Sequence, residues 1–412
     1  MFFLFAAQVT LAQAISVAAA RSPALRIATD TYRQTGAAVA LSNTPYQPNV
    51  TGTLSAVAGS SAPTAQSPSE DLAGVGLVQL VFDGGHVLAQ IRTAQATQSA
   101  GSGTLARSAQ QIAFNVAQTY YNALETRAAV KLALRIVAQD RAQENLIRAQ
   151  IDAGVASRVD LATAQIPTAQ ALVQVARTRG QDVAALAAFD NTMGLHANAD
   201  VEPAQDSAGE TSTSQIPNEP ATYDAAVEHA MSVRPDYQSA QRALVAANQT
   251  LRAAKTLDSP QVGVVANAGV ANLPGSGLGT LPNNFVGATI TLPFYDQGVR
   301  NAQSESASIG VDLQEATLSQ TELGIESDVR QALGTLTGAR DALVQAESEL
   351  RTAQEVLVDA QVQYRAGITN LALLLNAQSG LTQAETDRLT AVYALRQAEE
   401  SYLFALGDLR LP

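Results

Sequence analysis

Residues 81–85 read Val-Phe-Asp-Gly-Gly, and residues 294–298 read Phe-Tyr-Asp-Gln-Gly. The aspartates of these two motifs lie 213 residues apart. Further residues recur at the same offset: Ala153-Gly154 with Ala366-Gly367, Ala164-Gln165 with Ala377-Gln378, and Gly194 with Gly407. A repeat of this length indicates a duplicated domain, because the units of solenoid proteins span only about 20–50 residues.

Each motif follows an apolar segment and precedes a long helical pattern. Asp83 and Asp296 are predicted to cap the helices that follow, because a carboxylate accepts hydrogen bonds from free N–H groups at a helix start. Gly84, Gly85 and Gly298 permit a sharp turn. One copy alone reads equally well as a generic turn. Two copies in register favour a strand-to-helix switch.

The segment before each motif predicts a β-hairpin, at residues 48–82 and 260–295. Polar loops rich in Gly, Ser and Pro, residues 59–71 and 273–284, separate the strands. Each strand has about 9–11 residues, which is enough to cross a bilayer when tilted. Four strands are too few to close a barrel, and open edges are prohibitive in lipid. We therefore expect several chains to pool their strands.

The segment after each motif predicts a helix of about 66 residues, roughly 100 Å long at 1.5 Å per residue, ending at Ile151 or Tyr364. The second copy carries a strict heptad in two columns: Ala332, Ala339, Ala346, Ala353 and Ala360, and Val329, Leu336, Leu343, Leu350, Leu357 and Tyr364. A seven-residue repeat predicts a left-handed coiled coil. Returning helices at 157–193 and 370–406 complete helical hairpins over residues 84–194 and 297–407.

The domain organisation follows from this duplication. The first repeat covers residues 11–196 and the second covers residues 223–412, and each opens with a short helix broken at Arg21-Ser22-Pro23 or Arg234-Pro235. Proline then starts a second helix. Residues 197–222 are polar and read as a linker. Residues 1–10, with the apolar Met1–Ala7, are either a signal-peptide remnant or a frayed terminus.

Composition excludes several classes of function. The net charge of −12 argues against nucleic-acid binding, and the absence of cysteine excludes disulfides and thiolate chemistry. The three histidines have no metal-ligand spacing, and the glycine-rich residues 275–279 lack the Lys-Ser/Thr of a phosphate loop. The neighbouring acids Glu399 and Glu400 read as a solvated helix face. We therefore expect no enzymatic activity, no cofactor and no metal.

Together, the duplication, the twin Asp-Gly turns, the Arg-Pro helix breaks and the twin Ala-Gly ends resemble a TolC-type outer membrane factor over nearly the whole chain. The resemblance implies a mainly helical fold with a membrane β part. Long coiled-coil hairpins would form a periplasmic α-barrel. Four strands per chain would enter the twelve-stranded transmembrane β-barrel of a homotrimer.

The resemblance also implies a function. The chain would be an outer membrane channel-tunnel of a Gram-negative bacterium, with most of its residues in the periplasm. It would passively conduct drugs, small molecules or secreted proteins as the exit duct of a tripartite efflux or type I secretion system. Its partners would be two further copies, outer membrane lipid, a periplasmic adaptor (membrane fusion protein) and an inner-membrane pump of RND, ABC or MFS type.

In this family, adaptor hairpins dock at the tips of the tunnel. The matching positions here are Gly154, Val155 and Ala156 in the first half, and Gly367, Ile368 and Thr369 in the second. Small side chains there would let the adaptor helices approach closely. The two glycines are equally well explained by a helix that ends in the left-handed conformation.

Polar links hold the tip of the family's tunnel shut. Tyr364 and Asp160 match the tyrosine and the aspartate of these links, whereas Thr369 stands at the arginine position. Leu373 and Asn376 stand at the positions of the constricting acidic rings. We therefore expect a leucine ring that gates by bulk or by dewetting. Asp160 reads equally well as a first-turn helix acid that the helix dipole favours.

A different class of protein, a soluble periplasmic coiled-coil scaffold or adaptor, is the alternative. An adaptor should carry a compact β-rich domain on one helical hairpin. This sequence has two equivalent hairpins and strands of bilayer length, so it favours the duct.

Overall fold

The protein is described by a computed structural model, in which residues 8–57, 70–196, 199, 201–204, 216, 219–272 and 279–409 are placed. Its contacts divide the chain into two compact units. The sheet unit comprises Thr29–Thr104 and Asp236–Thr321, and the helical unit comprises Met1–Ala28, Leu105–Pro235 and Glu322–Pro412. Met1–Ala7 and most of both strand-connecting loops lie outside the described residues.

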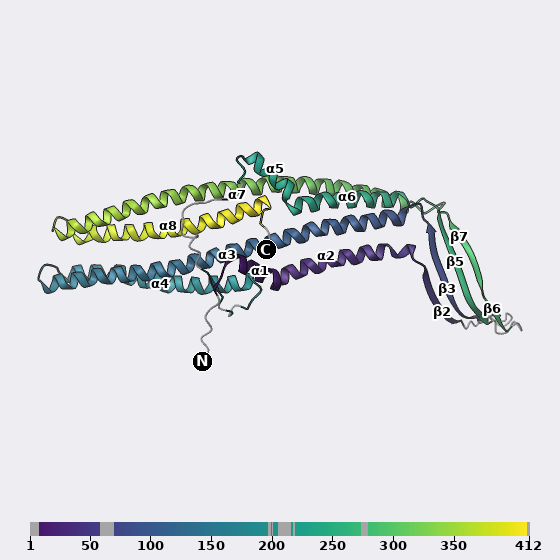
Figure 1. Cartoon of the computed structure of the whole chain (residues 1–412), viewed down its shortest axis with the longest axis horizontal. Coiled ribbons are helices and arrows are strands. Elements are labelled where there is room, and N and C mark those ends of the chain that lie inside the picture. The colour runs from purple at the N-terminus through teal and green to yellow at the C-terminus, as the bar shows by residue number, and fades with distance from the viewer. Residues whose placement is uncertain are drawn as a thin grey trace. The chain divides into compact units, whose positions relative to one another are not determined.

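Antiparallel strands form the sheet of the sheet unit (Figure 1). Neighbouring rows are β2 (Asn49–Val57), β3 (Glu70–Phe82) and β5 (Gln261–Asn272). Next to β5 lie β6 (Thr280–Pro282) and β7 (Phe285–Thr291), which pair with its two ends. Because β6 and β7 share one side of β5, they form a single interrupted row, and this sheet has the four rows that the sequence predicts.

The fourth row differs from the strand expected to run to residue 295. The strand β7 ends at Thr291, two residues before Pro293, because proline has no N–H to donate and restricts the residue before it. At the break between β6 and β7, the Asn283 N–H donates to the Gly269 oxygen (2.8 Å). The Gly269 N–H donates to Asn284 Oδ1 (2.9 Å). These two bonds replace the strand-to-strand backbone hydrogen bonds that are missing at the break.

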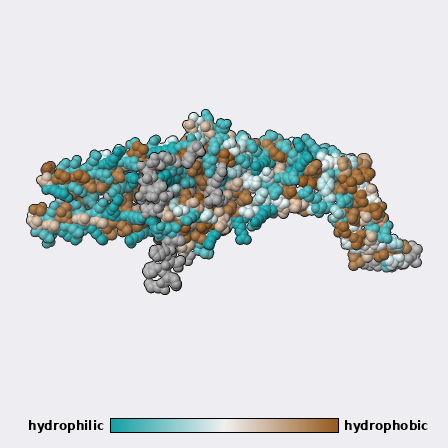
Figure 2. Space-filling model, viewed as in Figure 1, coloured by the Kyte–Doolittle hydropathy of each residue, from teal (hydrophilic) through white to brown (hydrophobic). Residues whose placement is uncertain are grey.

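The two faces of the sheet differ in chemistry. The strand register places on one face, called the apolar face, these side chains together with Gln79: Val50, Leu54, Ala73, Val75, Leu77, Val262, Val264, Ala266, Ala268, Val270, Val286, Ala288 and Ile290. The opposite face carries mostly Gly, Ser, Thr and Asn. Leu54 is 88% exposed and Val286 is 81% exposed, so the chain itself leaves the apolar face uncovered. Figure 2 shows hydrophobic residues gathered over these strands.

Four helices flank the sheet along the chain. They are α2 (Pro23–Ser42), α3 (His86–Asp152), α6 (Pro235–Lys255) and α7 (Val299–Arg365). The helices α3 and α7 have 67 residues each and contribute to both units. Their ends agree with the sequence prediction to within about two residues, which is the usual uncertainty of a helix boundary.

Capping aspartates start both long helices. Asp83 accepts hydrogen bonds from the N–H groups of Gly85 (3.0 Å) and Val87 (2.6 Å). Asp296 accepts the two equivalent bonds, from the N–H groups of Gly298 (3.2 Å) and Arg300 (2.8 Å). The identical pattern supplies acceptors for the free N–H groups of each first turn.

The residues after each aspartate have a left-handed backbone. The φ angles are 68° for Gly84 and 88° for Gly85, and 58° for Gln297 and 87° for Gly298. Gln297 is the one non-glycine residue with positive φ among those described. A Cβ on Gly84 would overlap the side chain of Ser259. Glycine is therefore required at 84 for conformation and for space, whereas Gln297 carries a conformational cost of about 1 kcal/mol.

The substitution Gln297→Gly should stabilise the protein by about 1 kcal/mol, because glycine adopts positive φ without penalty. Thermal unfolding of the detergent-solubilised protein measures the change. The matched control is Gln303→Gly in the interior of α7, which should destabilise by about 1 kcal/mol. Equal destabilisation by both substitutions would contradict the strain at Gln297.

Two helical hairpins dominate the helical unit (Figure 1). One joins α3 to α4 (Arg158–Thr192), and the other joins α7 to α8 (Leu371–Leu406). In α7 the predicted heptad columns are buried or half-buried at every position. Val329, Leu336 and Leu343 are at most 3% exposed. The predicted coiled-coil seam is therefore confirmed.

Two shorter helices, α1 (Leu11–Arg21) and α5 (Tyr223–Val233), repeat one packing contact. A Cβ on Gly194, after α4, would lie 2.8 Å from the oxygen of Arg21. A Cβ on Gly407, after α8, would lie 2.9 Å from Cγ of Arg234. Each pair brings the end of a returning helix onto the end of a short helix, so the duplication extends to tertiary packing.

Part of the polar segment 197–222, expected to be a linker, has regular structure. Within it, β4 (Glu202–Pro203) pairs in parallel with β1 (Gln8–Val9). Glu202 forms an ion pair with Arg127 of α3. Glu219 forms another with Arg340 of α7 at 2.8 Å. The segment therefore contacts both hairpins. A strand of two residues has no periodicity, so the sequence gives no signal for it.

The expectation that Glu399 and Glu400 form a solvated face is wrong. Glu399 is 9% exposed and pairs with Arg396 at 2.9 Å. Glu400 lies near Tyr121 of α3, and burial, followed by the charge of Glu399, raises the pKa of Glu400 to about 7. Helix α8 packs against neighbours on more than one side here, which the helical period of one sequence does not reveal.

Glu400 should make stability depend on pH. Its pKa is raised in the folded state, so the stabilisation is complete below about pH 4.5 and is lost as the pH rises to about 7. The loss should be about 2–3 kcal/mol. Chemical unfolding at a series of pH values measures it. The substitution Glu400→Gln should remove this dependence, whereas Glu355→Gln at an exposed position of α7 should leave it unchanged.

Candidate functional site

The two hairpin tips have the same backbone structure. In the first tip the N–H of Gly154 donates to the Ile151 oxygen, and the N–H of Val155 donates to the Gln150 oxygen, both at 2.9 Å. Gly367 and Ile368 make the equivalent bonds in the second tip, at 3.1 and 2.9 Å. This is the Schellman pattern of helix ends.

The tip glycines are needed for the left-handed backbone conformation at the end of each helix. Gly154 has φ 77° and Gly367 has φ 71°, and a Cβ on either would meet no atom within 4 Å. The residues after them are exposed apolar side chains, Val155 at 75% and Ile368 at 76%. Ala156 and Thr369 are half-buried. Each tip therefore presents one aliphatic side chain beside a bare stretch of backbone.

Asp160 forms a capping box with Ser157 at the start of α4. Its carboxylate accepts from the N–H and the hydroxyl of Ser157, both at 2.8 Å, and its own N–H donates to the Ser157 hydroxyl (3.2 Å). The bonds from Ser157 hold the pKa of Asp160 below its usual value. The geometry within the chain is that of a helix cap.

Tyr364 links the two hairpins near their tips. Its hydroxyl donates to Oε1 of Gln150 on α3 at 2.9 Å. Its ring packs beside the buried side chains of Ile147 and Leu371. Burial and then the charge of Asp160 raise the pKa of Tyr364. The structure thus brings Tyr364 and Asp160 into electrostatic range, but the hydrogen bond goes to Gln150.

Leu373 and Asn376 line an open groove between α7 and α8. The groove has a volume of about 870 Å³. Leu373 is 48% exposed, and Asn376 is exposed as well. The groove also contains the carboxylates of Glu349 and Asp359 from α7. Leu373 and Asn376 of α8 are not acidic, but the carboxylates of α7 make the surface of the same groove acidic.

Three residues of these surfaces were not predicted from the sequence: Gln150, Glu349 and Asp359. A signal existed for the two acids, because Glu349 precedes Leu350 and Asp359 precedes Ala360, two members of the heptad columns. Positions beside a heptad seam border the partner helix. Gln150 carries no such signal, because its partner is 214 positions away in the sequence.

The strand-to-helix turns lie in the sheet unit, apart in sequence from the tips. Asp83 is 3% exposed, and the Tyr46 hydroxyl donates to it at 3.4 Å. In the second turn Arg300 takes this place and pairs with Asp296 (2.7 Å) and with Asp258. The two turns therefore position the long helices, and the carboxylates of Asp83 and Asp296 are already bonded within the chain.

The duplicated hairpins and the four-row sheet correspond to a known family. The family profile described as "Outer membrane efflux protein" matches residues 14–195 and 226–408, one match to each repeat. The chain belongs to the outer membrane efflux protein family. Among the described residues, none of the helices combines the length and the apolarity needed to cross a membrane.

Two named proteins and one crystal structure illustrate the similarity. The chain is 26% identical to protein CyaE of Bordetella pertussis, over 97% of this chain and 84% of that protein. It is 23% identical to the outer membrane efflux protein BepC of Brucella suis, over 87% and 78%. A crystal structure of CusC has a TM-score of 0.84 at 20% identity, over 98% of this chain and 93% of that one.

Family membership fixes the class of function. This outer membrane efflux protein is a TolC-like channel of the Gram-negative outer membrane, in tripartite efflux or type I secretion, and is not an enzyme. The alternative of a soluble scaffold or adaptor is therefore set aside. The gate and docking residues inferred from the resemblance remain predictions.

The bond between Tyr364 and Gln150 should stabilise the contact between the hairpins by about 1 kcal/mol. A double-mutant cycle with Tyr364→Phe and Gln150→Leu, read by chemical unfolding, should give a coupling of this size. The matched cycle with Tyr364→Phe and Asp160→Asn should give a coupling near zero. A larger coupling with Asp160 would assign the tyrosine to a latch with that aspartate.

Proposed function

We propose that three copies of this chain form one passive duct, whose barrel crosses the outer membrane and whose helical part receives cargo from a pump. The observation that carries this proposal is the uncovered apolar face of a sheet with two open edges. The energy for transport comes from the inner-membrane pump, and the pump selects the cargo.

The open edges require further strands. The outer side of β2 and the outer side of the β6–β7 row have no partner strand among the described residues. In hydrocarbon each unpaired N–H or C=O group costs several kcal/mol, so a membrane sheet must close on itself. Edge pairing between copies of this chain supplies the missing hydrogen bonds and turns the apolar face toward lipid.

The proposal of three copies rests on the resemblance to the TolC-type family, whose members are trimers. Four rows from each of three copies give twelve strands, an even number as in bacterial barrels. The strands β3 and β5 have 13 and 12 residues, enough to cross the hydrocarbon core when tilted. The opposite face, rich in Gly, Ser, Thr and Asn, then lines a water-filled lumen.

The hairpin tips are the proposed docking points for a periplasmic adaptor. Val155 and Ile368 offer apolar contacts, and the glycines beside them keep the backbone accessible. A helical hairpin of an adaptor fits such a surface, because aliphatic side chains pack into its grooves. Thr369, Leu373 and Asn376 are the proposed constriction, with the bulk of Leu373 as the main barrier.

The mass of the protein extracted from outer membranes tests the assembly. Light scattering in detergent should give about three times 42.8 kDa for the protein part. A monomer or a dimer from correctly exported protein would refute the shared barrel, because the strand edges would then remain open.

The constriction is tested separately in planar bilayers. The substitution Leu373→Ala should raise the resting conductance several-fold, because it removes most of the proposed barrier. The matched control is Leu172→Ala on α4, where the leucine is 45% exposed but lies outside the groove. Unchanged conductance of Leu373→Ala would remove this residue from the gate.

A further inference from the structure

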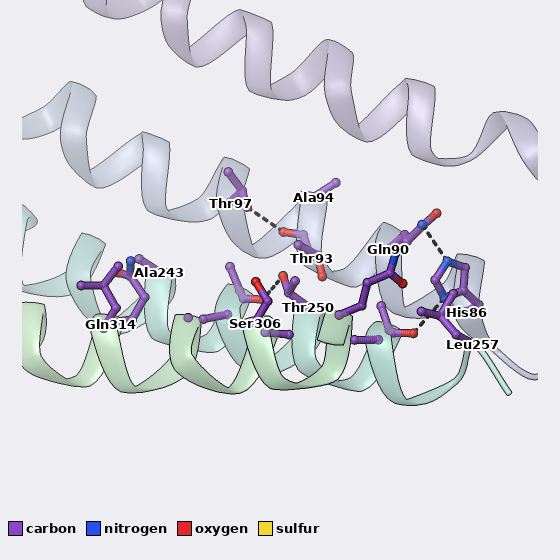
Figure 3. A pocket seen from close by; sticks show the side chains of 18 of the residues that line it. His86, Gln90, Thr93, Ala94, Thr97, Ala243, Thr250, Leu257, Ser306 and Gln314 are labelled. Atoms are coloured by element: carbon purple, nitrogen blue, oxygen red, sulfur yellow. Dashed lines mark hydrogen bonds between the residues drawn. The ribbon is translucent and has the colours of Figure 1, made fainter. Parts of the chain in front are cut away.

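A second groove, of about 1250 Å³, lies in the sheet unit between α2, α3, α6 and α7 (Figure 3). The figure shows Thr97 and Gln90 of α3 across from Thr250 of α6 and Gln314 of α7. Alanine and threonine account for most of its lining. This groove is called the uncharged groove, because among the described residues no Asp, Glu, Lys or Arg lines it.

The uncharged groove lies on the inner side of a curved helical layer. Helix α6 contacts α3 at Ala100, whose oxygen accepts from the Ser239 hydroxyl (2.8 Å). Helix α2 contacts α3 at Gly101, where a Cβ would lie 3.5 Å from Thr35 Oγ1. Consecutive helix residues point about 100° apart, so α6 and α2 lie in directions around α3 that differ by less than a half-turn. The three helices therefore form a bent layer, which is concave on the side between these two directions. Thr97, three and four residues before these contacts, lies on that side.

The one histidine in the lining is held at the end nearest the sheet. His86 Nδ1 lies 2.9 Å from the oxygen of Ala253, and Nε2 lies 2.9 Å from Nε2 of Gln90. Both ring nitrogens of His86 therefore have hydrogen-bond partners in the wall of the groove.

The hydroxyl groups of the lining threonines donate hydrogen bonds to backbone carbonyl groups. Thr35, Thr93, Thr97 and Thr250 each donate to a carbonyl of their own helix, at 2.6, 3.0, 2.9 and 3.0 Å. Their methyl groups, with the alanine methyl groups, remain for contact with a solute. The wall is thus apolar, with hydrogen-bond donors supplied mainly by glutamine amides such as Gln303.

We propose that the uncharged groove is a contact surface for uncharged, partly apolar cargo inside the duct. This inference rests on the proposed function. A charged solute would lose hydration there without meeting an opposite charge, whereas a neutral aromatic or aliphatic solute gains apolar contact. The acidic groove between α7 and α8 has the opposite character, with Glu349 and Asp359 in its wall.

The absence of cysteine from the chain permits a direct test. The variant Ala247→Cys places one thiol in the uncharged groove of the full-length protein, and Thr352→Cys places one in the acidic groove. The rate of N-ethylmaleimide labelling is measured by mass spectrometry in the presence of benzyl alcohol, benzylamine or benzoate. These three probes share one ring and differ in charge.

Benzyl alcohol should slow the labelling of Ala247→Cys several-fold, and benzylamine and benzoate at equal concentration should not. At Thr352→Cys, benzyl alcohol should give no protection. The isosteric change Gln303→Glu, added to Ala247→Cys, should confer protection by benzylamine. Equal protection by all three probes, or by none, would overturn the proposal. A thiol that fails to react at all would also overturn it, because a neighbouring copy would then cover the groove.

The same preparations separate this proposal from the function on which it rests. A conducting trimer without selective protection refutes the contact surface alone. A preparation that is neither trimeric nor conducting refutes the duct, whatever the labelling gives.

Discussion

The backbone N–H and C=O groups at the two edges of the sheet require hydrogen-bond partners, and this requirement governs the architecture of the protein. The inner rows β3 and β5 are paired on both sides, and even the break between β6 and β7 is bridged by Asn283 and Asn284. The outer edges are paired on one side. Together with an apolar face that the chain does not cover, these edges make one copy an incomplete membrane structure. In the proposed trimer, assembly and membrane insertion depend on each other, because the copies that pair with the open edges also complete the wall of the barrel.

Duplication supplies the repeated parts, and divergence adapts them. Both strand-to-helix turns keep the capping aspartate and the left-handed residues after it. The first turn adds the tyrosine Tyr46, whereas the second adds the ion cluster of Arg300 with Asp258 and Asp296. The same local geometry thus tolerates a neutral and a charged partner. The arginine-glycine contacts of Gly194 and Gly407 show that tertiary packing was duplicated along with the sequence.

Charge is distributed unevenly along the proposed path. The groove near the sheet is lined by methyl groups and amides, and the groove near the tips contains carboxylates from α7. In an acidic protein of net charge −12, the uncharged wall is a local property that composition conceals. In the proposed duct, such a division would let one groove discriminate by charge while the other contacts cargo through apolar surface.

The repeat, the four strand rows, the long helices and the coiled-coil seam can be predicted from the sequence alone, because each depends on short-range periodicity or on turn chemistry. Asp83 and Asp296 could be assigned as caps from the sequence because a cap and its helix are adjacent in the chain. Tertiary packing decides that the Tyr364 hydroxyl bonds Gln150, that Glu400 is partly buried near Tyr121, and that segment 197–222 contacts both hairpins. It also decides that no charged residue among those described lines the groove between α2, α3, α6 and α7. These features join residues that are far apart in the sequence, and one chain without its fold contains no measure of which distant side chains meet.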